Sequence, residues 1–348
     1  MTTLNQRPPA AHLHLPRRRR TDLAAPRPLQ AVWAASQDAD DPASRPRDGW
    51  WSVADWADTT LPLTVRGEVV GLAAIRVDPE GEAAEGRLAL RPDRRTHGAA
   101  RALVDAALGL AREGGAGRLR LVVPHPAGWA GDAARDAGFE VVRSTLVMLR
   151  PTSASSLGAP AVPEVRVRPL RPGEESTLLA VLNRAWAGTW GFGPIPPSAL
   201  EHDLEGQRDG MLVAIDADNE TRIVATVHAI FDPAARNQDG SPYAWISNLT
   251  TDPGWRGRGL GRLMLALGIG SLHDRGAGSV MLGVDGGNDA AVGLYRSAGF
   301  AVVSTTDILE RPLDGAAADH LWHLRHRPGD PSERWPASAS PRANKPNS

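Results

Sequence analysis

The sequence predicts an α/β protein that contains two tandem copies of one fold, and three observations support this. Strand and helix patterns alternate along both halves of the 348-residue chain. The same separation, 161 residues, relates Arg95 to Arg256 and Gly138-Phe139 to Gly299-Phe300. Between the halves, residues 151–163 are rich in Ser, Ala, Pro and Gly, as in a linker. A spacing that stays fixed through several successive elements is typical of a repeated domain.

The first half is expected to be a domain over 10–150, after a disordered N-terminus over 1–9. The basic run Arg17 to Arg20 is interpreted as the end of a strand at 13–17, with a nucleic-acid or targeting patch as the alternative. Runs of β-branched residues bounded by turns predict strands, and apolar residues at helical spacing predict helices. The remaining expected elements are helices at 22–36 and 50–56, strands at 61–66, 69–77 and 86–91, a helix at 101–112, a strand at 118–123, a helix at 127–137 and a last pair of strands that ends near Arg150.

The second half is expected to be a domain over 164–313, followed by a flexible tail over 314–348 that is rich in Ala, Pro and Ser. The same signals justify its elements. These are a strand at 165–170, a helix at 174–186, a loop at 190–194, a hairpin of 211–215 and 223–231, a strand at 244–251, a helix at 263–274, a strand at 279–285, a helix at 288–298 and strands over 300–313.

Composition excludes several classes of function. The formal net charge of −1 gives no bulk attraction to nucleic acid or to a membrane, and no apolar run is long enough to span a bilayer. The absence of cysteine excludes disulfides, thiolate zinc sites and a cysteine nucleophile. His320, His323 and His326 lie at helical spacing, which favours a solvated tail helix over a zinc site. We therefore expect a cytoplasmic protein without a metal and leave its oligomeric state open.

A glycine-rich loop lies between a predicted strand and a predicted helix in the second half. It runs Gly254-Trp255-Arg256-Gly257-Arg258-Gly259-Leu260-Gly261-Arg262. Glycines let the backbone approach a ligand closely, and the first turn of a helix offers unpaired N–H groups at the positive end of the dipole. Neither the Gly-Lys-Ser/Thr nor the GxGxxG phosphate loop is present. The loop is interpreted as a cradle for a pyrophosphate, and a Gly-rich turn with solvated arginines is the alternative.

A second motif, Asn288 to Phe300, has the features of a short amphipathic helix. Asn288 suits the N-cap position, and Gly299 suits the end of the helix. One apolar face is expected to pack on the sheet, and this places Tyr295 beside the carboxyl ends of the strands. The residues of that face are Ala291, Leu294, Tyr295 and Ala298.

Together the two motifs resemble the GNAT superfamily of acetyl-CoA-dependent N-acyltransferases, whose signature is Arg/Gln-x-x-Gly-x-Gly/Ala followed by an Asn…Leu-Tyr…Gly-Phe helix. The stretch from Arg256 to Gly261 matches the first pattern, and the Asn288 to Phe300 helix matches the second. In the first half, Arg95 to Ala100 matches the first pattern with Ala in the last position. The resemblance covers about residues 10–313 and implies two tandem GNAT folds, each a mixed, mostly antiparallel sheet flanked by helices.

The resemblance also implies the reaction and its residues. Acetyl-CoA would donate an acetyl group to a primary amine by direct attack in the C-terminal domain, with a small-molecule or peptide amine as acceptor. Tyr295 would protonate the departing thiolate; a buried aromatic with a satisfied hydroxyl is the alternative. A thiol titrates near about 8.5 and a tyrosine near about 10, so the two are not badly mismatched. The implied acetyl-CoA contacts are the backbone of Leu249, Thr250 and Thr251 between splayed parallel strands, the loop residues Arg256, Gly257, Arg258, Gly259, Leu260, Gly261 and Arg262, and Asn288.

The general base and the acceptor site are less defined by the sequence. Asp285, His228, Glu201 or a chain of waters could deprotonate the amine. The acceptor is expected to contact 186–196 and the loop 231–243. Trp190 and Phe192 suggest an apolar contact there, with simple packing of both side chains as the alternative.

The first half departs from the pattern at the positions that carry chemistry. Ala134 stands where the second half has Tyr295, and Ala127 stands where it has Asn288. We therefore expect the first half to keep the loop and at most bind CoA, and the second half to hold the one catalytic site. The tandem layout is also similar to the mycothiol synthases, which acetylate an amino-sugar conjugate of cysteine, although Trp245 replaces their glutamate near the start of the fourth strand. The competing interpretation is a non-catalytic CoA-binding or interaction module, which would not need Tyr295 with Asn288.

Overall fold

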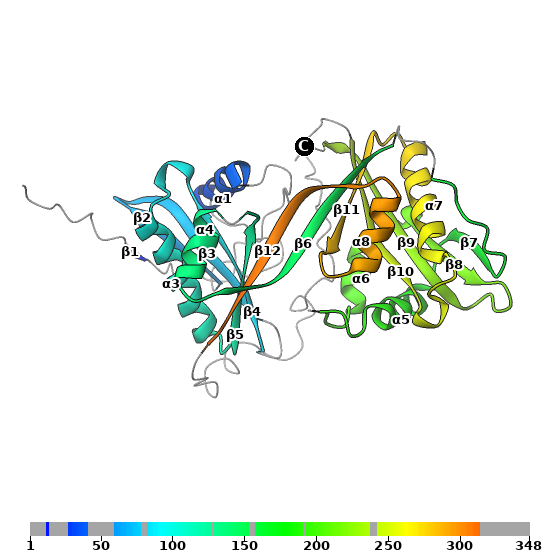
Figure 1. Ribbon diagram of the computed structural model, residues 1–348, viewed down its shortest axis with the longest axis horizontal. Helices are drawn as coiled ribbons and strands as arrows, with labels where there is room; N and C mark the ends of the chain where they lie inside the picture. Colours follow the sequence, from blue (N-terminus) through cyan, green and yellow to red (C-terminus); the bar gives the residue numbers. More distant parts are fainter. Residues whose placement is uncertain are drawn as a thin grey trace, which may run out of the picture. The chain divides into compact units, whose positions relative to one another are not determined.

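The computed structural model describes residues 12–13, 27–40, 59–77, 82–126, 128–152, 157–190, 192–236 and 242–313. The chain forms two compact units (Figure 1). Of the described residues, the first unit comprises those up to 144 together with 306–313, and the second comprises 145–305. Among the described helices, none is long and apolar enough to cross a membrane.

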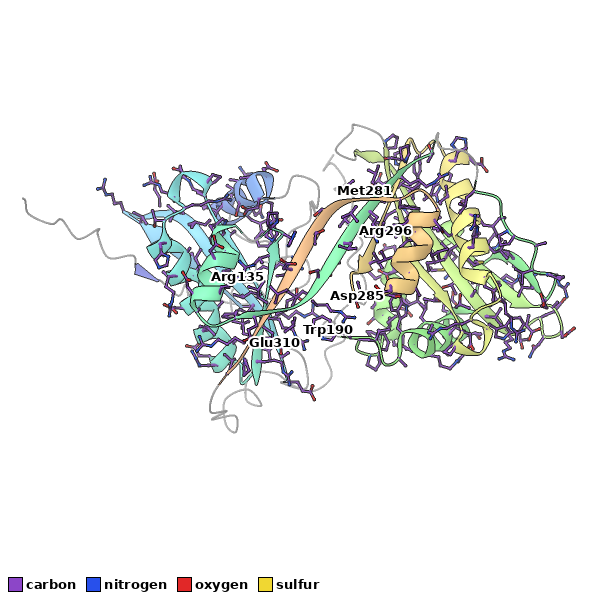
Figure 2. The ribbon with its side chains drawn as sticks, in the orientation of Figure 1. Arg135, Trp190, Met281, Asp285, Arg296 and Glu310 are labelled. Atoms are coloured by element: carbon purple, nitrogen blue, oxygen red, sulfur yellow. The ribbon has the colours of Figure 1, made fainter. Side chains whose placement is uncertain are left out.

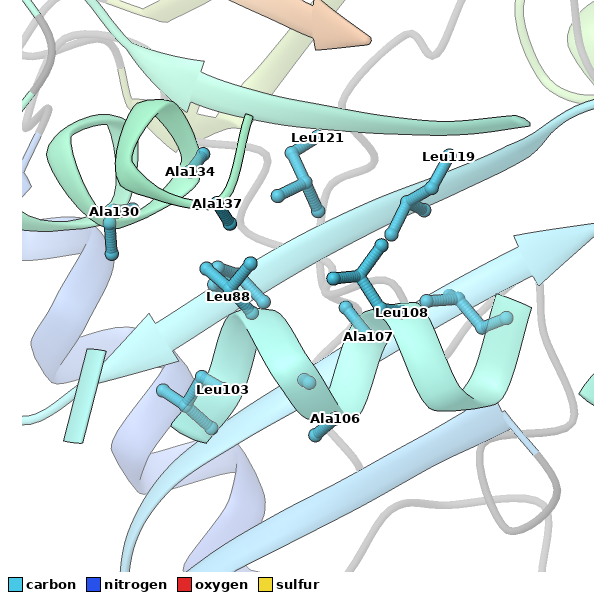
Figure 3. Packing of buried hydrophobic residues seen from close by; sticks show 14 of the residues in the cluster. Leu88, Leu103, Ala106, Ala107, Leu108, Leu119, Leu121, Ala130, Ala134 and Ala137 are labelled. Carbon is cyan, nitrogen blue, oxygen red and sulfur yellow. The ribbon is translucent and has the colours of Figure 1, made fainter. Parts of the chain in front are cut away.

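The first unit holds a mixed sheet in the strand order β1-β2-β3-β4-β5-β12. Every neighbouring pair is antiparallel except β4 and β5, which are parallel. Helix α1 packs on one face, against Leu72 and Ala89, while α3 and α4 pack on the other, against Leu88 and Leu121 (Figure 3). The strands are β1 His12–Leu13, β2 Thr60–Val65, β3 Glu68–Val77, β4 Ala84–Leu90, β5 Arg118–Pro124 and β12 Ala301–Pro312; the helices are α1 Arg27–Asp40, the 3-10 turn η2 Pro92–Arg94, α3 His97–Glu113 and α4 Trp129–Asp136.

The second unit repeats this plan in the strand order β6-β11-β10-β9-β8-β7. Its one parallel pair is β10 with β11, and the others are antiparallel. Helices α7 and α8 pack on one face, and α5 and α6 pack on the other. The strands are β6 Glu140–Pro151, β7 Val165–Pro169, β8 Met211–Asp216, β9 Ile223–Arg236, β10 Pro242–Thr251 and β11 Ser279–Asp285; the helices are α5 Glu175–Trp186, α6 Pro197–Leu204, the 3-10 turns η3 Arg208–Gly210 and η4 Pro253–Trp255, α7 Leu260–Asp274 and α8 Asp289–Ser297.

The two repeats exchange their last strands. Residues 145–151 of β6, from the first repeat, pair with β11 in the second unit. Residues 306–312 of β12, from the second repeat, pair with β5 in the first unit. Each sheet is therefore completed by a strand from the other repeat, so a fragment that ends at residue 150 lacks a strand of the first sheet.

The predicted fold class is confirmed, and the differences lie in individual elements. Each repeat ends in one strand of 12 residues where a pair of strands was predicted, because β6 and β12 continue from one unit into the other. Helix α6 was not predicted, since its eight residues begin with Pro and have little apolar periodicity. Helix α7 begins three residues earlier than expected, at Leu260. The predicted helix at 50–56 lies outside the described residues.

Candidate active site

The parallel strands β10 and β11 separate toward their carboxyl ends. They pair only at Trp245 with Met281 and at Ile246 with Leu282. A bulge in β10 follows directly, because its register with β9 shifts between Ser247 and Thr250. Antiparallel strands bend and lose ladder pairing at such a bulge. The result is a gap between two strand edges, where a ligand of extended shape could pair with the backbone.

The bulge is held open by specific contacts. Asn248 has a left-handed backbone, with φ of 46°. Its carbonyl accepts a hydrogen bond from the buried Thr226 hydroxyl at 2.6 Å, and the Thr226 and Thr250 hydroxyl oxygens lie 2.8 Å apart. Asparagine tolerates this conformation better than most residues. The distortion next to Leu249 is therefore a built feature of the strand.

The glycine-rich loop leaves the first turn of α7 without a side-chain cap. Gly257 and Gly259 have φ of +80° and +84°, and Gly259 is the N-cap residue. A side chain at either position would be strained, and the N-cap has no side chain that could accept from the first N–H groups. Those N–H donors, together with the positive end of a 15-residue helix, can bind an anionic group.

The three arginines of the loop have different surroundings. The Arg256 guanidinium donates to the Ala185 carbonyl at 2.8 Å, so it ties the loop to the end of α5. Arg258 is exposed and lies over the buried Trp255 ring, with Cζ at 4.6 Å from the ring centroid. Arg262 is exposed on the first turn of α7. All three arginines therefore bring positive charge to the loop, and Arg256 in addition positions the loop.

Tyr295 lies in the core beside α7 and β11. It is 7% exposed, and its ring meets Phe300 edge to face at 6.0 Å between centroids. Asn288 caps α8 by accepting a hydrogen bond from the Ala291 N–H at 3.1 Å, which fixes the start of the helix that carries Tyr295. Burial raises the pKa of Tyr295 to about 12. The phenol is therefore protonated at neutral pH, and it is a weaker acid than the free side chain assumed from the sequence.

A strand gap, a glycine-initiated helix and a buried tyrosine are thus found in one unit. The family model described as acetyltransferase (GNAT) family matches residues 25–139 and 177–300. The chain belongs to this family. It is an acyltransferase enzyme, and the two matched segments are its tandem repeats. Acetyltransferases of this family use acetyl-CoA and acylate small-molecule or peptide amines.

Individual relatives are similar over most of the chain. A mycothiol acetyltransferase of Thermomonospora curvata is 32% identical over 71% of this chain and 80% of the relative. One of Thermobifida fusca is 32% identical over 80% of this chain and 93% of the relative. Among solved structures, a GCN5-related N-acetyltransferase from Sphaerobacter thermophilus matches with a TM-score of 0.67 at 20% identity, over 82% and 92% of the two chains. A tandem GNAT protein of the clavulanic acid pathway matches with a TM-score of 0.57 at 17% identity, over 74% and 83%; both structures support the fold.

The three possible general bases lie in different places of this GNAT fold. His228 on β9 is fully buried, and its Nε2 lies 3.1 Å from the Gln207 carbonyl. Burial lowers the pKa of His228 to about 4. Glu201 lies on α6 and lines a cavity of about 470 Å³ beside η3, and none of the residues that line this cavity belongs to β10 or β11. Neither residue suits deprotonation of an amine at the gap.

Asp285 is the one of the three that lies beside the gap. It is the last residue of β11 (Figure 2) and is partly exposed. Its carboxylate accepts a hydrogen bond from the Gly287 N–H at 2.9 Å. Alternate residues of a strand share a face, so Asp285 lies on the same face as Gly283. A Cβ at Gly283 would lie 3.4 Å from the Trp245 ring, which places Trp245 on that face as well. This is the face covered by α5 and α6, opposite α7 and α8.

The predicted acceptor residues differ in exposure. Phe192 packs against the core cluster of α5 and α6, which fits the packing role given to it as an alternative. Trp190 remains 40% exposed. The three tail histidines lie outside the described residues, and within the described part no group of three potential metal ligands occurs.

In the first unit the equivalent loop is built differently. Thr96 stands where the second unit has Gly257, and its hydroxyl caps α3 by accepting from the Ala99 N–H at 3.2 Å. Arg95 forms an ion pair with Asp40 at 2.9 Å. Ala134, at the position of Tyr295, is fully buried in the core (Figure 3). The helix of the first half therefore starts two positions earlier in the repeat than α7, and the Thr96 hydroxyl takes up one of its N–H donors. The expectation that this half at most binds CoA stays a prediction.

Several contributors were not identified from the sequence. Arg222, in the β8–β9 turn, has its Cζ 5.8 Å from the centroid of the Trp255 ring. A Cβ at Gly259 would lie 3.9 Å from Pro160 and 4.0 Å from Val162, so the predicted linker passes beside the cradle. Arg150, from the first repeat, donates to the Ala298 carbonyl at the end of α8 at 2.7 Å. Of these, only Arg150 could have been identified from the sequence. Arg311 lies 161 residues after it, so the repeat has arginine at the same position in both copies.

Proposed function

We propose that the chain transfers an acetyl group from acetyl-CoA to a primary amine in the second unit. The observation that carries this proposal is the pairing of the β10–β11 gap with the uncapped start of α7 in one unit. The N–H groups from Leu260 to Arg262 take the diphosphate, and the backbone of Leu249, Thr250 and Thr251 pairs with the pantetheine arm. The first unit has a side-chain cap at the equivalent helix and contributes structure.

The residues around the gap supply the chemistry of direct transfer. Asp285 accepts a proton from the acceptor ammonium, and the free amine then attacks the thioester carbonyl. Backbone donors at the bulge stabilise the oxyanion that develops. Tyr295 donates a hydrogen bond to the departing sulfur and its proton as the carbon–sulfur bond breaks, and the proton that the nitrogen loses on forming the amide restores the phenol. The raised pKa of Tyr295 suits the donor role, because the phenol does not ionise in the working pH range.

One variant tests the role of Asp285 in this assignment. Purified protein is assayed for thiol release and for N-acetylated product against a panel of amines. Asp285→Asn is expected to lower kcat/KM most below the pKa of the acceptor amine, where a base is needed, and to recover in part at high pH. A loss that is independent of pH would remove Asp285 from the proton transfer. An intact protein that releases no thiol and forms no product with any amine would contradict the proposed function.

The acceptor that we favour within this function is an amino-sugar conjugate of cysteine. The observation in its favour is the 32% identity to mycothiol acetyltransferases over most of both chains. Trp245 lies on the acceptor face at the position where those proteins are expected to have a glutamate, and its ring over Gly283 gives the site an apolar wall. The amine panel therefore includes such a conjugate, simple primary amines and peptide N-termini. A preference for peptides would refute this choice of acceptor and leave the acetyl transfer standing.

A further inference from the structure

Two guanidinium groups are held next to the cradle by one tryptophan ring. Trp255 belongs to η4 and is 8% exposed. The Cζ atoms of Arg258 and Arg222 lie 4.6 and 5.8 Å from its ring centroid. A planar guanidinium that lies over an aromatic face is held in place without losing its hydrogen-bond donors. The ring therefore preorganises two cations beside the start of α7.

Arg222 is fixed there by its own hairpin. It lies in the turn between β8 and β9, where the Asp216 N–H donates to the Arg222 carbonyl at 3.0 Å. The Asp252 N–H, just before η4, donates to the Val224 carbonyl at 2.9 Å. These backbone contacts join the turn to the loop that carries Trp255. Arg222 thus reaches the cradle from a segment far away in the sequence.

The positive charge at this place is only partly balanced by the protein. Arg222 has Asp216 at 3.9 Å and lies near the Asp252 carboxylate, which pairs with Arg184 at 2.8 Å. Among the described residues, no ion pair joins Arg258 or Arg262 to a carboxylate. In the first unit the residues at the positions of Arg258 and Arg262 do have carboxylate partners: His97 lies 3.7 Å from Asp136, and Arg101 lies 3.0 Å from Asp105. Arginines that are held close together with few counter-charges repel one another, and a bound dianionic ligand offsets this electrostatic repulsion.

We propose that Arg222 and Arg258 bind the 3′-phosphate of the coenzyme's adenosine and make the enzyme select CoA over 3′-dephospho-CoA. This inference rests on the proposed function, which assigns the diphosphate to the backbone donors of α7. Coenzyme A carries a second, separate phosphate on its ribose, and a backbone cradle for one phosphate group leaves the other to side chains. The pair on Trp255 has the charge, the exposure and the fork-shaped donors that a phosphate monoester needs.

The test compares two donors with three variants of the full-length chain. Binding of CoA and of 3′-dephospho-CoA is measured by calorimetry, and kcat/KM is measured with both acetylated donors. Arg222→Gln and Arg258→Gln are each expected to weaken CoA binding about 10-fold, the effect of losing one charged hydrogen bond, and to weaken binding of 3′-dephospho-CoA much less. His97→Gln, the first unit's equivalent of Arg258, serves as the matched control and is expected to change neither affinity. Unchanged melting temperatures show that the exposed replacements leave the fold intact.

Two results would overturn the inference. Equal losses for both donors would mean that the arginines act on the diphosphate, and no loss in either variant would mean that they bind no part of the coenzyme. Both results are distinguishable from failure of the proposed function, in which the unmodified chain binds neither donor and transfers no acetyl group.

Discussion

The loops that open α3 and α7 occupy the same place in the two repeats and differ in how their backbone donors are used. At α3, the Thr96 hydroxyl accepts the Ala99 N–H, and the helix begins at His97. At α7, Gly259 provides no side chain, and the helix begins at Leu260, two positions later in the repeat. The α3 loop therefore hydrogen-bonds one of its own N–H groups, whereas the α7 loop leaves its N–H groups available to a ligand.

The side-chain charges of the two loops also differ: those of the first unit have carboxylate partners within the protein. The carboxylates that pair with His97 and Arg101 in the first unit are Asp136 and Asp105. At those positions the second repeat has Ser297 and Ala266. A helix start with unbalanced cations attracts an anion, whereas a capped and neutralised one does not. The comparison shows that equivalent helix starts can differ by gaining internal partners, and the predictions below test whether this difference decides which one binds a ligand.

The largest expected effect concerns the residue that the first repeat lacks. Tyr295→Phe keeps the ring contact with Phe300 and removes the hydroxyl. We expect kcat to fall about 100-fold or more, the usual contribution of a positioned acid, with little change in CoA affinity. Steady-state kinetics and calorimetric titration with CoA check both parts. Because the pKa of Tyr295 is raised to about 12, the unmodified enzyme should show no alkaline loss of activity from this group below that range; normal turnover by the variant would exclude the acid role.

The next prediction compares equivalent glycines of the two loops. Gly259→Ala places a Cβ on a left-handed residue, which costs about 1–2 kcal/mol, and we expect CoA affinity to fall about 10-fold as the loop shifts. Gly98→Ala is the matched control, because Gly98 lies in the first turn of α3, its φ is not positive and nothing lies within 4 Å of its Cβ position. That change should leave CoA binding unaltered and raise stability slightly, by about 0.5–1 kcal/mol. Equal effects of the two changes on CoA affinity would contradict the distinction between the loops.

A third prediction concerns a feature that both repeats retain. Arg150 donates to the Ala298 carbonyl at 2.7 Å, and Arg311, at the same position of the repeat, donates to the Ala137 carbonyl at 2.6 Å. Each arginine lies on an exchanged strand and caps the last turn of a helix in the unit which that strand completes. Replacing either residue by Leu should cost about 1–3 kcal/mol of unfolding free energy, as expected for a lost charged hydrogen bond.

The two arginine variants should differ in their effect on activity. Arg150→Leu loosens α8, which carries Tyr295, so kcat should fall along with stability. Arg311→Leu loosens α4, which carries Ala134 at that position, so kcat should stay near normal at temperatures where the protein is folded. Denaturant unfolding and kinetics on both variants check this, and a large loss of kcat in Arg311→Leu would show that the first unit takes part in catalysis.

The sequence was sufficient for what depends on short-range signals. The alternation of elements, the repeat of 161 residues and the glycine loop all follow from local patterns, and they led to the fold class and the family. The strand exchange could not be predicted, because the sequence patterns of β6 and β12 indicate strands but do not indicate which sheet each strand joins. Arg222 was missed for the same reason, since only the pairing of β8, β9 and β10 brings it to Trp255. The bond of Arg256 to Ala185 could not be predicted either, because it depends on where α5 ends.

The smallest expected effect compares the acid sensitivity of the two units. His228 in the second unit is buried, and burial lowers its pKa from 6.5 to about 4. The unfolded state therefore binds a proton between these values that the folded state does not, so stability is lost as pH falls below 6.5. In the first unit, burial raises the pKa of Glu85, so that group favours folding as pH falls and acts in the opposite direction.

Unfolding at about pH 7 and about pH 5.5 measures this difference, because a single group shifted in this way changes stability by about 1 kcal/mol over that interval. Hydrogen exchange followed by mass spectrometry reports the two units separately, and the second unit should lose protection first on acidification. His228→Gln removes the titrating group and should flatten the pH dependence of the second unit, while Glu85→Gln should affect only the first. If His228→Gln left the acid sensitivity of the second unit unchanged, then a group other than His228 would have to bind the proton taken up on unfolding.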